Sequence, residues 1–177
     1  DDLVTGVQTC ALPIFSKWET HANEESSPIA RDAVVAVIGL ESGLPVDAVR
    51  DAIAGGIARW RSVVVPGLVN RLALEQAEQD AEHVVLSASH DDHEWRDFCV
   101  RSADRIVLVT CRASPPAHSN VAWHGADVLI IDTVPTNAQW SAWETAIHPE
   151  YSRTTSVNQL VEDCKPIADR IAGRSIG

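Results

Sequence analysis

The chain has 177 residues, of which 45% are hydrophobic, and its formal net charge of −11 becomes −9 without Asp1 and Asp2. This acidic balance repels nucleic acid and anionic lipid headgroups, and no apolar run approaches the ~20 residues of a membrane span. The length suits one well-buried domain, so we expect a soluble, cytoplasmic protein that binds neither nucleic acid nor a membrane directly.

The N-terminal segment is interpreted as non-native. From Val4 to Ile14 the sequence VTGVQTCALPI resembles the translation of a common short-read sequencing adapter, so residues 1–14 are excluded from fold reasoning. The alternative is a genuine short apolar N-terminus. Residues 15–31 are polar and lack periodicity, which predicts a linker ahead of an α/β domain over residues 32–172.

Five short apolar runs are predicted to be strands, because continuous apolar segments of this length are typical of strands buried on both faces. They cover residues 33–38, 62–65, 83–87, 105–110 and 126–132. Helical periodicity between them implies right-handed β-α-β crossovers and a mostly parallel sheet. The predicted fold class is α/β, a single three-layer domain with a Rossmann-like or degenerate P-loop-like sheet of about five strands.

Apolar residues at three- and four-residue spacing predict the helices. The helices and the side chains expected to face the core are a helix from Pro45 with Val46, Val49, Ile53 and Ile57; residues 68–79 with Leu68, Leu72 and Ala73; a helix with Trp95, Phe98 and Cys99; residues 137–147 with Trp140, Trp143 and Ile147; and residues 157–164 with Val157, Leu160, Val161 and Cys164. A last helix begins at Pro166 and is closed by Gly173. Residues 174–176 are expected to begin a further strand, so residues 173–177 are interpreted as the start of a missing domain.

The turn after the first strand is where such folds usually hold phosphates. Residues 39–45 (GLESGLP) lack the lysine–hydroxyl pair of a P-loop and any Gly-x-Gly-x-x-Gly, and they carry Glu41, which would repel phosphate. An ordinary strand-to-helix turn is favoured, and loss of nucleotide binding from an ancestral P-loop-like scaffold is compatible with it. Ser42 does not sit in a nucleophile elbow, since the preceding glycine is misplaced. We expect Ser42 to cap the following helix.

One cluster contains residue types that bind metals. His90, Asp91, Asp92 and His93 are followed six residues later by Cys99. Zinc sites draw their ligands from clearly spaced pairs, and only one pair is evident here. A solvated acidic loop is therefore favoured, and no metal is expected. The other histidines considered, His83, His118, His124 and His148, are scattered.

The cysteines and tryptophans have structural interpretations. With Cys10 in the adapter-like segment, Cys99, Cys111 and Cys164 show no paired spacing, which suits a reducing compartment. Three of the six tryptophans lie at helical core spacing. Trp123, in the long loop after residue 110, is hypothesised to contact a neighbouring domain.

The segment from Trp95 to Val109 (WRDFCVRSADRIVLV) resembles a distinctive stretch of one protein family, the bacterial type of the neuropathy target esterase group of patatin-like phospholipases. The family pattern is W-x-x-x-C-x-R-Q-A-D-x-(I/V)-L-(I/L)-V, and Ser102 stands where Gln is usual. The resemblance covers residues 32–177 and includes the closing phrase IADRIAGRSIG; it departs between residues 111 and 120. The matching residues are Trp95, Cys99, Arg101, Ala103 and Asp104.

The resemblance implies a place within a longer protein. In that group a cyclic-nucleotide-binding-like domain comes first, then an α/β segment, then the patatin domain with its GGGARG oxyanion loop. This chain would be the non-catalytic linker or regulatory domain, packing Ile176 and its last helix against the neighbouring catalytic domain. The parent would be a lysophospholipase or esterase with a Ser–Asp dyad, peripheral at the inner membrane and touching it only through the parent's other parts.

No catalytic, cofactor-binding or metal-binding residue is assigned within this chain. The family's Gly-x-Ser-x-Gly and Asp-Gly-[Gly/Ala] motifs are expected beyond residue 177. Two alternatives stay open. Residues 83–110 loosely resemble the later strands of ParA/MinD-like ATPases, which would make the chain a degenerate nucleotide-binding domain, although the absent P-loop lysine argues against it. The other alternative is an interaction module without a ligand.

Overall fold

The computed structural model describes residues 34–66, 70–118 and 120–174. The chain divides into two compact units between Ala30 and Arg31, and all of the described residues belong to the second unit. The expectations for residues 1–33, including the adapter-like segment and the linker, lie outside the described residues. The same is true of Leu68 and of the strand expected to continue through Ile176.

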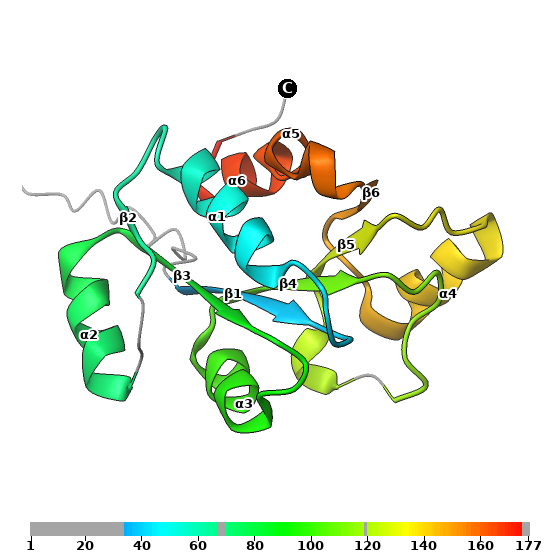
Figure 1. The fold of residues 1–177 in the computed structure, drawn as a ribbon, viewed down its shortest axis with the longest axis horizontal. Coiled ribbons are helices and arrows are strands. Elements are labelled where there is room, and N and C mark those ends of the chain that lie inside the picture. The colour runs from blue at the N-terminus through cyan, green and yellow to red at the C-terminus, as the bar shows by residue number, and fades with distance from the viewer. Residues whose placement is uncertain (1–33, 67–69, 119, 175–177) are drawn as a thin grey trace, which may run out of the picture. The chain divides into compact units, whose positions relative to one another are not determined.

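A wholly parallel sheet of six strands forms the middle layer of this unit (Figure 1). The spatial order is β2-β3-β1-β4-β5-β6. The α/β class with a parallel sheet is therefore confirmed. The strands are β1 (Val34–Gly39), β2 (Val63–Val64), β3 (His83–Ala88), β4 (Arg105–Thr110), β5 (Asp127–Ile131) and β6 (Ser152–Thr155).

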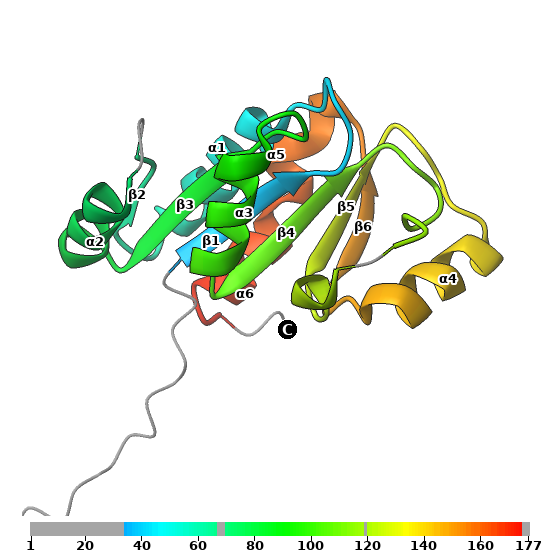
Figure 2. The same ribbon diagram turned by 90° about the horizontal axis from the view of Figure 1, so that it is seen from below.

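Helices cover both faces of the sheet, which gives three layers (Figure 2). The first face carries α1 (Val46–Ile57), α5 (Leu160–Asp163) and α6 (Lys165–Ile171). The second face carries α2 (Arg71–Asp80), α3 (His93–Ser102) and α4 (Asn137–Ile147). Two short 3-10 turns are η1 (Val121–Trp123) and η2 (Val157–Gln159).

The central strands are apolar throughout because each of their faces is covered. In β1, Val35 and Val37 join the core under α1, whereas Val34, Ala36 and Ile38 join the core under α3. All five side chains are at most 1% exposed. This burial on both sides is why β1 has a continuous apolar sequence rather than an alternating one.

Local sequence signals account for several helix ends. Asn70 accepts a hydrogen bond from a backbone N–H at the start of α2, and Asp92 does the same for α3. Thr136 and Gln139 form a reciprocal capping box at the start of α4. Gly173, at φ +72°, follows α6 in the left-handed conformation that favours glycine.

The inward face expected for α2 is wrong. Leu72 is 74% exposed, and the helix buries Leu74 and Ala77 instead. The expectation placed the start of the helix at residue 68, whereas Asn70 caps it and the helical turn begins at Arg71. Because α2 lies beside the short edge strand β2, only a narrow stripe of the helix meets the sheet.

The single helix expected over residues 157–164 is divided into η2 and α5. Leu160 and Cys164 are buried as expected, but Val157 and Val161 are 51% and 64% exposed. A 3-10 turn has about three residues per turn rather than 3.6, so Val157 does not stay on the buried side of the α-helix that follows.

Strand β6 was not expected from the sequence, which predicted about five strands. Its residues are Ser152, Arg153, Thr154 and Thr155, of which only Thr155 is buried. Among the strands that the structure describes, β6 pairs with β5 alone, and it therefore stands at the edge of their sheet. An edge strand is half covered, so it lacks the apolar run that marks the central strands. Among the described helices, none combines the length and apolar character needed to cross a membrane.

Candidate functional site at the carboxyl edge of the sheet

The crevice outside the carboxyl ends of β1 and β4 is where an open parallel sheet usually binds its ligand. From β1 the chain departs through α1 toward β2, on one side of the sheet. From β4 it departs toward β5, on the other side. Because these two connections diverge, the loops that follow Gly39 and Thr110 lie side by side at this edge, where Glu41 of one loop contacts the other. Residues 39–45, which lack a P-loop sequence, form the first of these loops.

The carboxylate of Glu41 lies between these two loops. The Thr110 hydroxyl lies 2.9 and 3.1 Å from its two oxygens, and the Cys111 backbone N–H donates to Oε2 at 3.1 Å. Arg112 Nε pairs with Oε1 at 2.9 Å. The Glu41 side chain is 15% exposed. Three consecutive residues at the end of β4 therefore satisfy both oxygens of a carboxylate that comes from the loop after β1.

These donors are oriented by bonds that do not involve Glu41. The Thr110 hydroxyl accepts the Arg112 backbone N–H at 2.9 Å, which leaves its own proton for the carboxylate. Thr133, just beyond β5, donates its hydroxyl to the Cys111 carbonyl at 2.8 Å. The segment after β4 is thus also bonded within itself and to Thr133, in addition to its bonds to Glu41.

Ser42 does not cap α1, so that expectation is wrong. Its hydroxyl donates to Asp91 at 2.6 Å and joins the loop after β1 to the loop after β3. Helix α1 begins directly after Pro45 and has no side-chain cap. Gly43, at φ +78°, turns the backbone between Ser42 and the helix, so Ser42 lies too early in the loop to reach the first helical N–H groups.

A second polar cluster at this edge fastens α1 to the end of β3. The Ser87 hydroxyl donates to Asp47 at 2.6 Å and accepts from Arg50 at 3.1 Å. Arg50 also pairs with Asp47 at 3.1 Å. The Ser87–Asp47 pair is thus engaged by a guanidinium, and Asp47 is largely exposed. This arrangement positions the helix rather than activating the hydroxyl.

The structure separates the residues of the candidate metal cluster. The rings of His90 and His93 lie 5.9 Å apart, while Asp92 is used to cap α3. Cys99 is fully buried in the core. Within residues 34–66, 70–118 and 120–174, no three His, Cys, Asp or Glu side chains are grouped closely enough to hold a metal ion.

The two buried thiols are poor nucleophiles. Burial, with a smaller effect from the Asp92 charge, raises the pKa of Cys99 to about 12. Burial, with a further increase from Asp163, also raises the pKa of Cys164 to about 12, although Arg153 opposes it. Both thiols therefore stay protonated at neutral pH. Cys111 is exposed, and its Sγ lies 3.8 Å from a Glu41 oxygen.

The residues that carry the family resemblance have structural contacts. The Trp95 indole N–H donates to the Ser87 carbonyl at 2.8 Å, and Cys99 packs in the core beneath α3. The Asp104 carboxylate accepts the Val34 backbone N–H at 2.9 Å, and the Asp104 N–H donates to the Val34 carbonyl at 2.8 Å. These contacts fasten α3 to β3 and the start of β4 to the start of β1.

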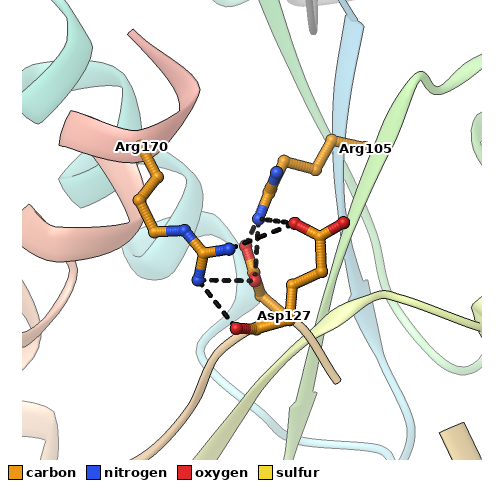
Figure 3. A network of polar contacts seen from close by, with 4 residues as sticks. Arg105, Asp127 and Arg170 are labelled. Atoms are coloured by element: carbon orange, nitrogen blue, oxygen red, sulfur yellow. Dashed lines mark hydrogen bonds and ion pairs between the residues drawn. The ribbon is translucent and has the colours of Figure 1, made fainter. Parts of the chain in front are cut away.

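A buried ionic network lies at the opposite, amino edge of the sheet (Figure 3). Arg105 donates to both oxygens of Asp127, at 2.9 and 3.0 Å, and Asp127 is 0% exposed. Arg170 of α6 lies 4.0 Å from Asp127. Glu150 pairs with both arginines at 3.1 Å. The network thus joins β4, β5 and α6.

The surroundings of Asp127 act on its charge in opposite directions. Burial raises the pKa of the Asp127 carboxyl, whereas the hydrogen bonds and charge of Arg105 and the charge of Arg170 lower it, with burial the larger effect. A polar hollow of about 200 Å³ lies beside the network, lined by residues that include Asp104, His124 and Glu150.

Trp123 packs partly into the core near this hollow. Its indole N–H is buried and has no hydrogen-bond acceptor in the described part of the chain. The hypothesis that Trp123 contacts a neighbouring domain stays a prediction, because the described residues belong to one unit and do not test it.

One motif at the C-terminus needs a correction. Gly173 to Gly177 reads Gly-Arg-Ser-Ile-Gly and so has the Gly-x-Ser-x-Gly spacing that was expected only beyond residue 177. A nucleophile elbow follows a strand and opens a helix, whereas Gly173 directly follows helix α6. Ser175 lies outside the described residues.

Comparisons with known proteins add little. No protein-family model matches the chain, and no curated protein matches it. Among solved structures, an unliganded sugar kinase from Janibacter sp. HTCC2649 aligns with 10% sequence identity and a TM-score of 0.33. The alignment covers 81% of this chain and 95% of the kinase chain. A similarity this low carries no argument about function.

Proposed function

We propose that this chain is a non-catalytic linker or regulatory α/β domain of a patatin-like lysophospholipase or esterase. In this proposal the parent protein hydrolyses lipid acyl esters with a Ser–Asp dyad on a neighbouring patatin domain. The resemblance between Trp95 and Val109 supports the family. The matching residues Trp95, Cys99 and Asp104 contact the sheet or the core, which suits a structural role for this segment.

The observation that carries the non-catalytic role is the closure of the ligand-binding edge by the chain's own side chains. Glu41 is bonded to Thr110 and Cys111 at the end of β4, and Ser42 beside it is bonded to Asp91. A substrate or nucleotide phosphate at this position would meet a carboxylate that already uses the available donors. The proposal is therefore that the domain acts through contacts with a neighbour.

An esterase assay tests the division of roles. We expect the 177-residue chain to leave p-nitrophenyl acyl esters and lysophospholipid unhydrolysed above the buffer rate. A chain extended through the reading frame of the source DNA into a patatin-like region should hydrolyse both. Saturable hydrolysis by the 177-residue chain alone, abolished by a covalent serine inhibitor, would contradict the proposal. A reading frame that ends natively after Gly177 would contradict the hydrolase assignment.

Nucleotide titration tests the ParA/MinD-like alternative. We expect 1 mM ATP with Mg²⁺ to leave the thermal midpoint of the wild-type chain unchanged, because residues 39–45 lack the P-loop lysine. ATP that bound at a concentration 100 times its Kd would stabilise the fold by about 2.7 kcal/mol, so binding would be visible. A saturable rise of the midpoint would instead favour the nucleotide-binding alternative.

A further inference from the structure

We propose that Trp60 is a positioning residue that holds the chain where it leaves helix α6, so that the segment after Gly173 departs in one fixed direction. Four residues make this contact, and together they are called the exit clamp: Arg59, Trp60, Asp169 and Arg174. The exit clamp itself belongs to the α/β unit alone. Its consequence for a following domain, which it would orient, rests on the proposed function.

The exit clamp joins α6 to the turn that follows α1. Trp60 lies in this turn, and its indole N–H donates to the Asp169 carboxylate at 3.0 Å. Arg59 donates to the same carboxylate oxygen, also at 3.0 Å. The neighbouring residues of the two helices are Gly56 and Ala168, where α1 and α6 approach each other most closely among the glycine positions of α1. The exit clamp therefore extends the contact between these two helices to the end of α6.

Arg174 completes the exit clamp. Its guanidinium carbon lies 4.0 Å from the centre of the Trp60 ring, well within the ~6 Å at which a cation is attracted to an aromatic face. The Arg174 backbone N–H donates to the Asp169 carbonyl at 2.8 Å, and Gly173 turns the chain there with a φ of +72°. Both the backbone and the side chain of Arg174 are therefore held at the point where the chain leaves the helix.

Trp60 is the member on which the exit clamp depends most. The ion pair between Arg59 and Asp169 is partly exposed, at 41% and 30%, and such pairs contribute little. The indole of Trp60, in contrast, contacts both the Asp169 carboxylate and the Arg174 guanidinium. Trp60 is 45% exposed, so its replacement should weaken the exit clamp and leave the core of the fold intact.

Limited digestion with trypsin tests the exit clamp on the 177-residue chain. Trypsin cleaves after an arginine whose side chain enters the specificity pocket of the protease, so cleavage between Arg174 and Ser175 requires Arg174 to leave the indole. The cleavage rate then follows the population of the open form. Release of residues 175–177 is measured by intact mass spectrometry and normalised to the cleavage of a reference peptide added to each digest.

We expect Trp60→Leu to release residues 175–177 about fivefold faster than the wild type does, because an exposed cation–π contact of ordinary strength favours the closed form by about that factor. Trp60→Phe keeps an aromatic face and loses the indole N–H, so its rate should be intermediate. Trp140→Leu makes the same substitution in α4, which covers the other face of the sheet. This control for a general loss of stability should cleave at the wild-type rate.

The inference is overturned if folded Trp60→Leu releases residues 175–177 no faster than the wild type, or if Trp140→Leu accelerates the release equally. If Trp60→Leu does not fold, Asp169→Ala replaces it. That variant removes the acceptor of the indole N–H and keeps the backbone carbonyl, and it should also accelerate the release; an unchanged rate contradicts the proposal. A negative result leaves the linker proposal intact, and a failed esterase assay leaves the exit clamp intact, because the digestion measures the α/β unit alone.

Discussion

Among the described acidic residues, Asp127 is the most deeply buried. It is 0% exposed, and both of its oxygens accept hydrogen bonds from Arg105. Burial of an ion is costly, and the pair is stabilising only while both partners remain. The residue is therefore expected to be sensitive even to a substitution that preserves its size.

We expect Asp127→Asn to lower the free energy of unfolding by about 3 kcal/mol. The asparagine would direct an NH₂ group at a guanidinium N–H, donor against donor, in place of an oxygen. Glu150 still pairs with Arg105, which keeps the loss at the lower end of the range for a broken buried pair. Urea unfolding followed by circular dichroism measures the change.

A matched control uses the exposed pair between Arg71 and Glu75, whose side chains are 86% and 51% exposed. Glu75→Gln should change the unfolding free energy by less than about 0.5 kcal/mol, since exposed ion pairs contribute little. Equal effects of the two substitutions would show that the Asp127 network is not a structural element of the core.

Single residues also show where reasoning from sequence stops. The burial of Val49, Ile53 and Cys99 was predictable from spacing alone. The exposure of Leu72 was not, because it depends on where the helix begins and how much of α2 the sheet covers. The position of Glu41 was not predictable either, since its partners Thr110 to Arg112 lie 69 to 71 residues away in sequence.

At the scale of elements, the packing of α1 against α6 depends on a glycine. A Cβ at Gly56 would lie 2.5 Å from the Cβ of Ala168 in α6, whereas a Cβ at the neighbouring Gly55 would have no atom within 4 Å. The absence of a side chain at Gly56 thus allows α1 and α6 to approach each other closely. At Gly55 the packing of the helix does not require a glycine.

We expect Gly56→Ala to destabilise the fold by about 1–3 kcal/mol, because the two helices must separate or shift. Gly55→Ala should stabilise it by up to about 1 kcal/mol, since alanine has the higher helix propensity and the position is exposed. Thermal or urea unfolding of the two variants gives the signs directly. A stabilising Gly56→Ala would mean that α1 and α6 are not in close contact.

Elements differ in how strongly the sequence marks them. The four central strands and helix α4 were predictable because an apolar run or a capped periodic segment is a local signal. β6 and the break between η2 and α5 were missed. They stand at the periphery of the sheet, where pairing and partial burial decide the structure and the side chains carry no clear pattern.

At the scale of the whole molecule, one buried thiol lies in the core on each face of the sheet. Cys99 belongs to the cluster under α3, and Cys164 belongs to the cluster under α1 and α6. Burial raises the pKa of each from 9.0 to about 12. The folded state therefore keeps two protons that the unfolded state releases above pH 9.

The sign of the pH dependence follows. Stability from these groups is fully present below pH 9 and is lost as pH rises from 9 toward 12. We expect the unfolding free energy to fall by about 2.7 kcal/mol between pH 8 and pH 10, since each of the two protons contributes about 1.4 kcal/mol per pH unit above pH 9. Urea unfolding as a function of pH measures this slope.

Cys99→Ala and Cys164→Ala should each reduce the slope by up to one proton, and Cys111→Ser, at an exposed site, should leave it unchanged. A slope that is the same in all four proteins would show that the buried thiols do not titrate with unfolding. A slope reduced by only one of the alanine variants would assign the alkaline loss to a single layer.

The sequence by itself determined the fold class and most of the sheet, because these depend on residues within a few positions of one another. The tertiary structure decided the sixth strand, the helix faces in contact with the sheet, and the contact of Glu41 with the end of β4. The Glu41 contact requires parts of the chain about 70 residues apart to meet at one edge of the sheet. A local pattern carries no information about that distance, and only the closed packing of three layers supplies it.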